Sequence, residues 1–192
     1  IPREDTAVLV EAVCKRLSKT ENLPKGLDLC AGTGAVGLSI AKEAHAEVTE
    51  VELYDGAFNY LNENLARYPE LPGTAGKGDM LDKAFAETLP DGFDFIASNP
   101  PYVASMDILT LDSSVRDYEP LGALDGGEDG LMFYRAIVRH WTQILRPGGW
   151  LMFEVGEDQA DAVMALMTEE KYTDVTALED TAGIRRVVVG RI

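Results

Sequence analysis

Basic side chains are scarce in this sequence of 192 residues. Lysine and arginine number 17 against 33 aspartates and glutamates, which leaves a formal net charge of -16. Such a charge repels a phosphate backbone over most of the surface, so duplex nucleic acid is disfavoured as a partner. A basic protein partner fits the charge better, and the alternative is that the charge only confers solubility.

Cysteines and long apolar runs are also scarce. Cys14 and Cys30 are the only thiols, and a chain of this length can bury a core without disulfides, which is compatible with a reducing compartment. No apolar run approaches the roughly 20 residues that span a bilayer, and no basic-then-apolar leader precedes Ile1. We therefore expect a cytoplasmic protein that makes no contact with membrane.

Short apolar segments alternate with segments of helical periodicity along the whole chain. This alternation predicts an α/β domain with a mostly parallel sheet covered on both faces. No helix separates the last two expected strands, so they should pair antiparallel at one edge. A long loop is expected over 99–129 and a short helix before Leu89. The other expected helices cover 6–18, 35–44, 56–66, 131–145 and 159–167, and the strands 27–29, 48–53, 74–77, 93–97, 150–155, 175–178 and 186–189.

A glycine-rich turn follows the first expected strand. The run from Gly32 through Thr33, Gly34 and Ala35 to Gly37 spells G-x-G-x-x-G, and Glu52 ends the next strand. Small residues let the backbone approach a ligand at the free N–H groups of a helix, while an acid accepts hydrogen bonds from ribose hydroxyls. The motif alone fits a dinucleotide, S-adenosylmethionine, or a tight turn without a ligand.

Three further residues bear on that choice. Asp28 precedes the turn, where it would face a cationic amino group or organise the loop but would repel a pyrophosphate. It therefore favours S-adenosylmethionine. Asp79 can accept the adenine amino group, and the backbone N–H of Met80 can meet a ring nitrogen; a simple turn explains this pair equally well.

Asn99, Pro100, Pro101 and Tyr102 directly follow a buried-type strand, at the edge where doubly wound sheets bind ligands. The two prolines fix the backbone. The Asn99 oxygen and the Pro100 carbonyl can each accept one N–H of a planar NH2 group, and Tyr102 can stack on its face. The segment thus predicts methyl transfer to a planar nitrogen by positioning and electrostatics, without a nucleophilic residue or a metal. A Pro-Pro turn without a substrate is the plain alternative.

These motifs together resemble the release-factor glutamine methyltransferase (HemK/PrmC) family over essentially the whole chain. The Asn-Pro-Pro-Tyr element is shared with adenine-specific DNA methyltransferases, so it indicates the chemistry, whereas the opening Pro-Arg and the Tyr-Glu-Pro segment point to the glutamine family. The resemblance rests on Pro2-Arg3 with Asp5-Thr6, Asp28 to Gly34, Ser98 to Tyr102, Tyr118-Glu119-Pro120 with Ala123-Leu124, Gly127 with Asp129-Gly130, and Gly148-Gly149.

The resemblance implies a class I S-adenosylmethionine-dependent methyltransferase fold, which is Rossmann-like, with a mostly parallel seven-stranded sheet and an antiparallel edge strand. It implies that Asn99 to Tyr102 hold a glutamine of a peptide-chain release factor. The whole of 1–192 would be the catalytic domain, without the helical N-terminal recognition domain of the family. The cofactor would contact Asp28, Cys30, Ala31, Gly32, Thr33, Gly34, Glu52, Asp79, Met80 and Asn99.

Two residues depart from the family pattern. Cys30 stands where glycine is usual, and it fits if its backbone angle is ordinary; Glu52 stands where aspartate is usual, one methylene longer. Other functions stay open at this point. They are glutamine methylation of a ribosomal protein, adenine N6 methylation of nucleic acid, and, from another class, a nicotinamide-dependent dehydrogenase or a nucleotide sensor without catalysis.

Overall fold

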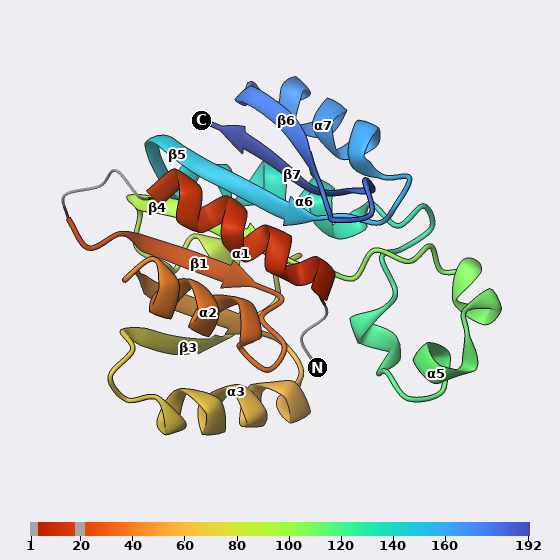
Figure 1. Cartoon of the computed structure of the whole chain (residues 1–192), viewed down its shortest axis with the longest axis horizontal. Coiled ribbons are helices and arrows are strands. Elements are labelled where there is room, and N and C mark those ends of the chain that lie inside the picture. Colours follow the sequence, from red (N-terminus) through yellow and green to blue (C-terminus); the bar gives the residue numbers. More distant parts are fainter. Residues whose placement is uncertain (1–3, 18–21) are drawn as a thin grey trace.

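One seven-stranded sheet with helices on both faces forms the body of the molecule (Figure 1). The computed structural model describes residues 4–17 and 22–192. The strand order is β3-β2-β1-β4-β5-β7-β6, and the expected mostly parallel sheet is confirmed. The strands are β1 (Lys25–Leu29), β2 (Glu47–Glu52), β3 (Gly73–Lys77), β4 (Phe93–Ser98), β5 (Leu145–Glu154), β6 (Thr173–Glu179) and β7 (Arg185–Arg191).

The antiparallel pairing of the last two strands is also confirmed. Strand β7 runs antiparallel to both β5 and β6, between which it lies, and the remaining neighbours pair in parallel. The chain therefore reverses once at this side of the sheet, through the tight turn at Gly183, whose φ is +80°.

Helices α1 (Glu4–Leu17) and α2 (Ala35–Glu43) cover one face of the sheet, and α6 (Met132–His140) and α7 (Ala160–Glu169) cover the other. Helix α3 (Asp55–Arg67) packs along β3, and α4 (Lys83–Ala86) joins the core under α6. The Pro2-Arg3 pair and the expected helix end at Ser18 lie outside the described residues. None of the described helices is both long and apolar enough to span a membrane.

Alternation along the central strands separates apolar from acidic side chains. Leu27, Leu29 and Val51 pack into the core beneath α6 and α7. Asp28 and Glu50 occupy intervening positions, so they face the opposite side, toward α2. This side of the sheet therefore carries buried acids directly beneath the helix that follows the glycine turn.

Two expected boundaries are wrong between α6 and β5. The helix expected over 131–145 ends at His140 and is followed by a short 3-10 turn at Thr142–Ile144. The Pro147-Gly148-Gly149 segment lies inside β5, where it forms an irregularity opposite Phe93 and Phe95. Gly148 adopts φ +80°, and proline lacks the N–H that a regular ladder needs, so the strand bulges here without ending.

The expected long loop between β4 and α6 contains short helical turns. We call residues 103–130 the arm; it includes α5 (Ser113–Arg116), which stands away from the sheet at the right of Figure 1. Hydrogen bonds join the beginning of the arm to residues near its end. The Val103 N–H donates to the Leu124 carbonyl at 2.9 Å, and the Gly126 N–H donates to the Val103 carbonyl at 2.8 Å. Both of its ends are thereby fixed beside Tyr102.

Candidate active site

The predicted site residues follow four neighbouring strands whose carboxyl ends meet at one edge. Leu29 pairs with Val51 on one side and with Ser98 on the other, and β2 pairs in turn with β3. The segments that follow β1, β2, β3 and β4 are therefore brought together (Figure 1). This is the location expected for a ligand in a doubly wound sheet.

The glycine turn between β1 and α2 needs glycine at two positions. Gly32 has φ +59° and Gly34 has φ +83°, a region that side chains with a Cβ rarely adopt. Gly34 is the N-cap of α2 and offers no side-chain cap. A Cβ added at Gly32 would meet no atom within 4 Å, so the backbone of this turn faces open space. A ligand can approach it closely.

Cys30 corrects one expectation from the sequence. Its φ is +60°, so its backbone angle is not ordinary and falls where glycine is preferred. A left-handed conformation costs a residue with a Cβ roughly 1–2 kcal/mol. Burial, with the nearby charge of Glu52, raises the pKa of the Cys30 thiol. The thiol therefore stays protonated and is a poor nucleophile.

Asp28 organises the turn, which is one of the two roles expected for it. Its carboxylate is 1% exposed and accepts a hydrogen bond from the Gly37 N–H at 2.9 Å. Gly37 is the third residue of α2, so Asp28 supplies the cap that Gly34 lacks. Burial raises the pKa of Asp28 to about 7, the Gly37 hydrogen bond opposes that shift, and the charge of Glu52 adds to it.

Glu52 binds the backbone of two loops at once. Its Oε2 accepts from the Gly32 N–H at 2.8 Å, and its Oε1 accepts from the N–H groups of Leu53 and Tyr54 at 2.9 and 2.8 Å. The side chain is 5% exposed. A carboxylate has about four acceptor positions, so one remains for a ligand hydroxyl. The extra methylene relative to aspartate lets the carboxylate reach across to the glycine turn.

Asp79 and Met80 lie on the far side of Glu52, after β3. One oxygen of Asp79 accepts from the Leu81 N–H at 2.8 Å, which leaves the other oxygen to face a ligand. The Met80 side chain is buried, and its carbonyl accepts from the indole N–H of Trp141 at 3.0 Å. Any ligand contact of Met80 is therefore made by its backbone N–H.

The segment from Asn99 to Tyr102 is held from both sides. The Ser98 hydroxyl before it donates to the Leu29 carbonyl at 2.7 Å, and the amide of Gln159 donates to the Tyr102 carbonyl at 2.9 Å. Pro100 and Pro101 are buried, whereas Asn99 is half-buried. Among the described residues, none forms a hydrogen bond with the Asn99 side chain. Its oxygen and NH2 group are therefore available to a ligand.

Sequence reasoning missed three residues of this site. Ser98 could have been noticed as a hydroxyl at the end of an apolar strand, but nothing in the sequence marks Gln159. The third is Glu50, which is the Cα partner of Asp28 on the adjacent strand and is fully buried. Neither oxygen of Glu50 has a hydrogen-bond partner among the described residues. Burial, and next the charge of Asp28, raise the pKa of Glu50 to about 9.

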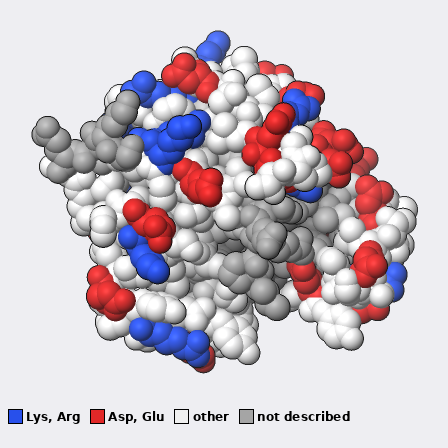
Figure 2. All heavy atoms as spheres, viewed as in Figure 1, with Lys and Arg blue, Asp and Glu red and all other residues white. Residues whose placement is uncertain are grey.

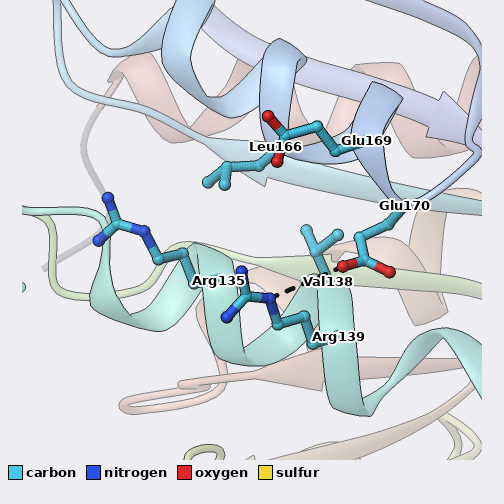
Figure 3. Close-up of a pocket in the computed structure, with 6 residues that line it drawn as sticks. All are labelled: Arg135, Val138, Arg139, Leu166, Glu169 and Glu170. Atoms are coloured by element: carbon cyan, nitrogen blue, oxygen red, sulfur yellow. Dashed lines mark ion pairs between the residues drawn. The ribbon is translucent and has the colours of Figure 1, made fainter.

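Two hollows lie away from the glycine turn. The hollow between α6 and α7 in Figure 3 is bridged by an ion pair from Arg139 to Glu170 at 3.7 Å, and none of its lining residues is a predicted site residue. A larger hollow of about 670 Å³ is lined by Gly127, Glu128, Asp129, Met132 and Arg135. The side chain of Gln159 donates hydrogen bonds to the carbonyls of Gly130 and Tyr102. Because Gly130 directly follows the lining residue Asp129, this second hollow adjoins the segment from Asn99 to Tyr102.

Comparison with known proteins shows which family the chain belongs to. Residues 4–112 match the model of the methyltransferase small domain. The release factor glutamine methyltransferase of Geobacter sulfurreducens is 40% identical over all of this chain, and that of Clostridium botulinum is 37% identical over all of it. This chain belongs to the release factor glutamine methyltransferase family.

The family resemblance read from the sequence is thus confirmed. The chain spans 65% and 67% of the length of these two relatives. The crystal structure of a release factor-specific protein-(glutamine-N5) methyltransferase from Alicyclobacillus acidocaldarius matches the whole chain and 93% of its own, with a TM-score of 0.61 and 27% identity. The class I methyltransferase fold is confirmed as well, and membership of the family favours methyl transfer over the dehydrogenase alternative.

Proposed function

We propose that this domain transfers a methyl group from S-adenosylmethionine to the side-chain amide nitrogen of a glutamine in a peptide-chain release factor. One observation carries the proposal. In a chain of this family, the Asn99 side chain has no hydrogen-bond partner among the described residues, and its backbone is held beside the glycine turn by the pairing of Ser98 with Leu29 and by two buried prolines. An available amide beside a cofactor turn suits the recognition of another planar NH2 group.

The residues at the carboxyl edge fit the cofactor. The open space over Gly32 admits a ligand, and the remaining acceptor position of Glu52 suits a ribose hydroxyl. Asp79 offers one oxygen, and Met80 its backbone N–H, to an adenine ring. S-adenosylmethionine supplies an electrophilic methyl group on a positively charged sulfur, and the carboxylates of Glu52 and Asp79 at this edge favour that charge.

Asn99, Pro100 and Tyr102 then orient the amide. The Asn99 oxygen and the Pro100 carbonyl each accept one N–H of the substrate, so the nitrogen is fixed in position, and the Tyr102 ring covers its planar face. Acceptors placed on both N–H groups stabilise the positive charge that develops on nitrogen as the methyl group arrives. The nitrogen–methyl bond forms as the sulfur–methyl bond breaks, S-adenosylhomocysteine is the leaving group and keeps that electron pair, and the substrate nitrogen releases its proton to solvent. Buried Pro101 keeps the segment rigid.

A protein substrate needs a surface beyond the glutamine itself, and the arm is our candidate for it. Residues 103–130 carry seven acidic side chains and one basic, a net charge of -6. Figure 2 shows acidic side chains outnumbering basic ones where the arm lies. Met106 and Tyr118 expose 77% and 84% of their surfaces. This composition suits a basic segment with apolar side chains on the partner.

The proposal is tested by incubating the protein with labelled S-adenosylmethionine and three separate substrates. These are a release-factor domain, a ribosomal protein and an adenine-containing oligonucleotide. We expect the label on a glutamine of the release factor and none on its Gln→Glu variant. Label on the ribosomal protein alone would show that the substrate is a ribosomal protein and not a release factor. Label on the oligonucleotide alone would show that the enzyme methylates adenine and not glutamine.

A further inference from the structure

Glu50 is a buried acid for which the proposed reaction has no use. It lies on β2 with a side chain that is fully buried and whose oxygens have no hydrogen-bond partner among the described residues. Buried polar groups are nearly always paired, so an unpaired carboxyl group requires an explanation. Glutamate is also among the residues that are almost never fully buried without a partner.

The position of Glu50 connects it with the cofactor turn. A Cβ added at Gly34 would lie 2.6 Å from Glu50 Oε2, and one added at Gly37 would lie 2.4 Å from Glu50 Cδ. The carboxyl group therefore packs directly against the backbone of the first turn of α2. Two glycines at these positions leave the volume that this side chain fills.

Among the residues that the structure describes, the groups that face Glu50 include no basic side chain to balance a charge. Asp28 faces it from β1 as its cross-strand partner, and Glu52 lies two residues further along β2. Helix α2 offers the backbone of Gly34 and Gly37, α3 offers Leu61, and β3 offers Gly73. The positive N-terminal end of α2 already binds Asp28, so it offsets a second negative charge only in part.

We propose that Glu50, in its neutral protonated form, is a positioning residue of the cofactor site that supports the glycine turn from beneath. This inference rests on the proposed binding of S-adenosylmethionine at that turn. Once Glu50 loses its proton, the charge needs water, and water can enter only if the first turn of α2 moves away from β2. That movement carries Gly32 to Gly34 with it and weakens the cofactor site.

The pH dependence follows in sign from the two raised pKa values. The folded protein keeps protons on Asp28 and Glu50 that the unfolded chain has lost, so folding is favoured most below the ordinary carboxyl pKa. Stability declines as pH rises from the ordinary carboxyl pKa through the folded-state values, and cofactor affinity declines as pH rises past about 9, where Glu50 loses its proton. Because the two acids are neighbours, they titrate as a pair.

The test measures the binding of S-adenosylhomocysteine by calorimetry from about pH 6 to about pH 10, with thermal unfolding of the ligand-free protein at each pH. Three forms are compared: wild type, Glu50→Gln, and the control Glu47→Gln, which changes a partly exposed glutamate on the same strand. Glu50→Ala, smaller and uncharged, replaces Glu50→Gln if that variant does not fold. Comparing forms at one pH removes the contribution of the ligand's own amino group, which titrates near pH 8.

We expect the affinity of wild type and of Glu47→Gln, relative to that of Glu50→Gln at the same pH, to fall about tenfold between about pH 6 and about pH 10, because roughly one Glu50 in ten keeps its proton one unit above a pKa of about 9. Glu50→Gln should also unfold with a flatter pH profile. If Glu50→Gln and wild type show the same pH profile while both bind, the inference is overturned and the proposed function stands. If no form binds at any pH, the proposed function fails, and this inference fails with it.

Discussion

Replacing Glu52 tests the coupling between this acid, to which we assign ribose binding, and the glycine turn. Glu52→Gln keeps the shape and one acceptor oxygen for the N–H groups of Leu53 and Tyr54. It places an NH2 group against the Gly32 N–H, where the carboxylate oxygen accepts at 2.8 Å in the wild type. The Gly32 N–H donor then faces the NH2 donor of the new side chain, and the hydrogen bond between them is lost.

The expected magnitude comes from that one contact. A hydrogen bond to a charged group is worth about 1.5–3 kcal/mol, so Glu52→Gln should lower the free energy of unfolding by about that amount. The affinity for S-adenosylhomocysteine should fall at least about tenfold, since each 1.4 kcal/mol is a factor of ten. Glu52→Ala, which loses all three contacts, should cost more on both measures.

Urea unfolding and calorimetry provide the two measurements, with Glu47→Gln as the partly exposed control on the same strand. That control should change the free energy of unfolding by less than about 0.5 kcal/mol. A Glu52→Gln protein that unfolds at the same urea concentration as wild type and binds the ligand equally well would refute the assignment of Glu52 to the turn.

Four further outcomes are expected. Asn99→Ala should lower turnover at least about a hundredfold, because it frees the substrate amide to rotate, with little change in melting temperature; full activity would remove the proposed mechanism. Tyr102→Phe should be mild and Tyr102→Ala severe in the same methylation assay, and equal rates for both would exclude stacking. Gly34→Ala should lower the free energy of unfolding by about 1–3 kcal/mol, because the added Cβ would lie 2.6 Å from Leu61 Cδ1 and the backbone angle φ is +83°. Urea unfolding measures this change, and unchanged stability would show that the turn can relax. Calorimetry should find that S-adenosylhomocysteine binds and that NAD binds weakly or not at all. Tighter binding of NAD would contradict the inference that Asp28 repels a pyrophosphate.

The sequence predicted the layout of the fold because its signals were local. Apolar strands, glycine turns and the Asn-Pro-Pro-Tyr segment can each be recognised from a few consecutive residues. The carboxyl ends of parallel strands meet at one edge of the sheet, so these segments are expected to lie together. The boundary errors arose at Pro147 to Gly149. A proline followed by two glycines is typical of a break in structure, but β5 accommodates it as a bulge.

The details that the sequence could not give depend on distant contacts. Cys30 adopts a left-handed backbone angle because the turn requires it, and its residue type predicts the opposite. Gln159 bonds to Tyr102 across 57 positions of sequence. Glu50 is an acid in a strand whose partner across the sheet is another acid. Propensity alone would place such a residue at the surface.

The proposed role of the arm in recognising the partner can be tested apart from the chemistry. Changing Tyr118 to Ser alters a side chain of the arm that is 84% exposed. It should raise the KM for the protein substrate and leave cofactor affinity unchanged. A drop in cofactor affinity instead would show that the arm belongs to the cofactor site.

Methyl transfer to a release-factor glutamine is the most direct test of the account. A release-factor domain is incubated with S-adenosylmethionine and this protein, and peptide mass spectrometry then locates any added methyl group. The account predicts a methyl group on one glutamine side chain, absent with Asn99→Ala and absent when the glutamine is replaced by glutamate. Transfer to another residue, or no transfer while S-adenosylhomocysteine still binds, would contradict it.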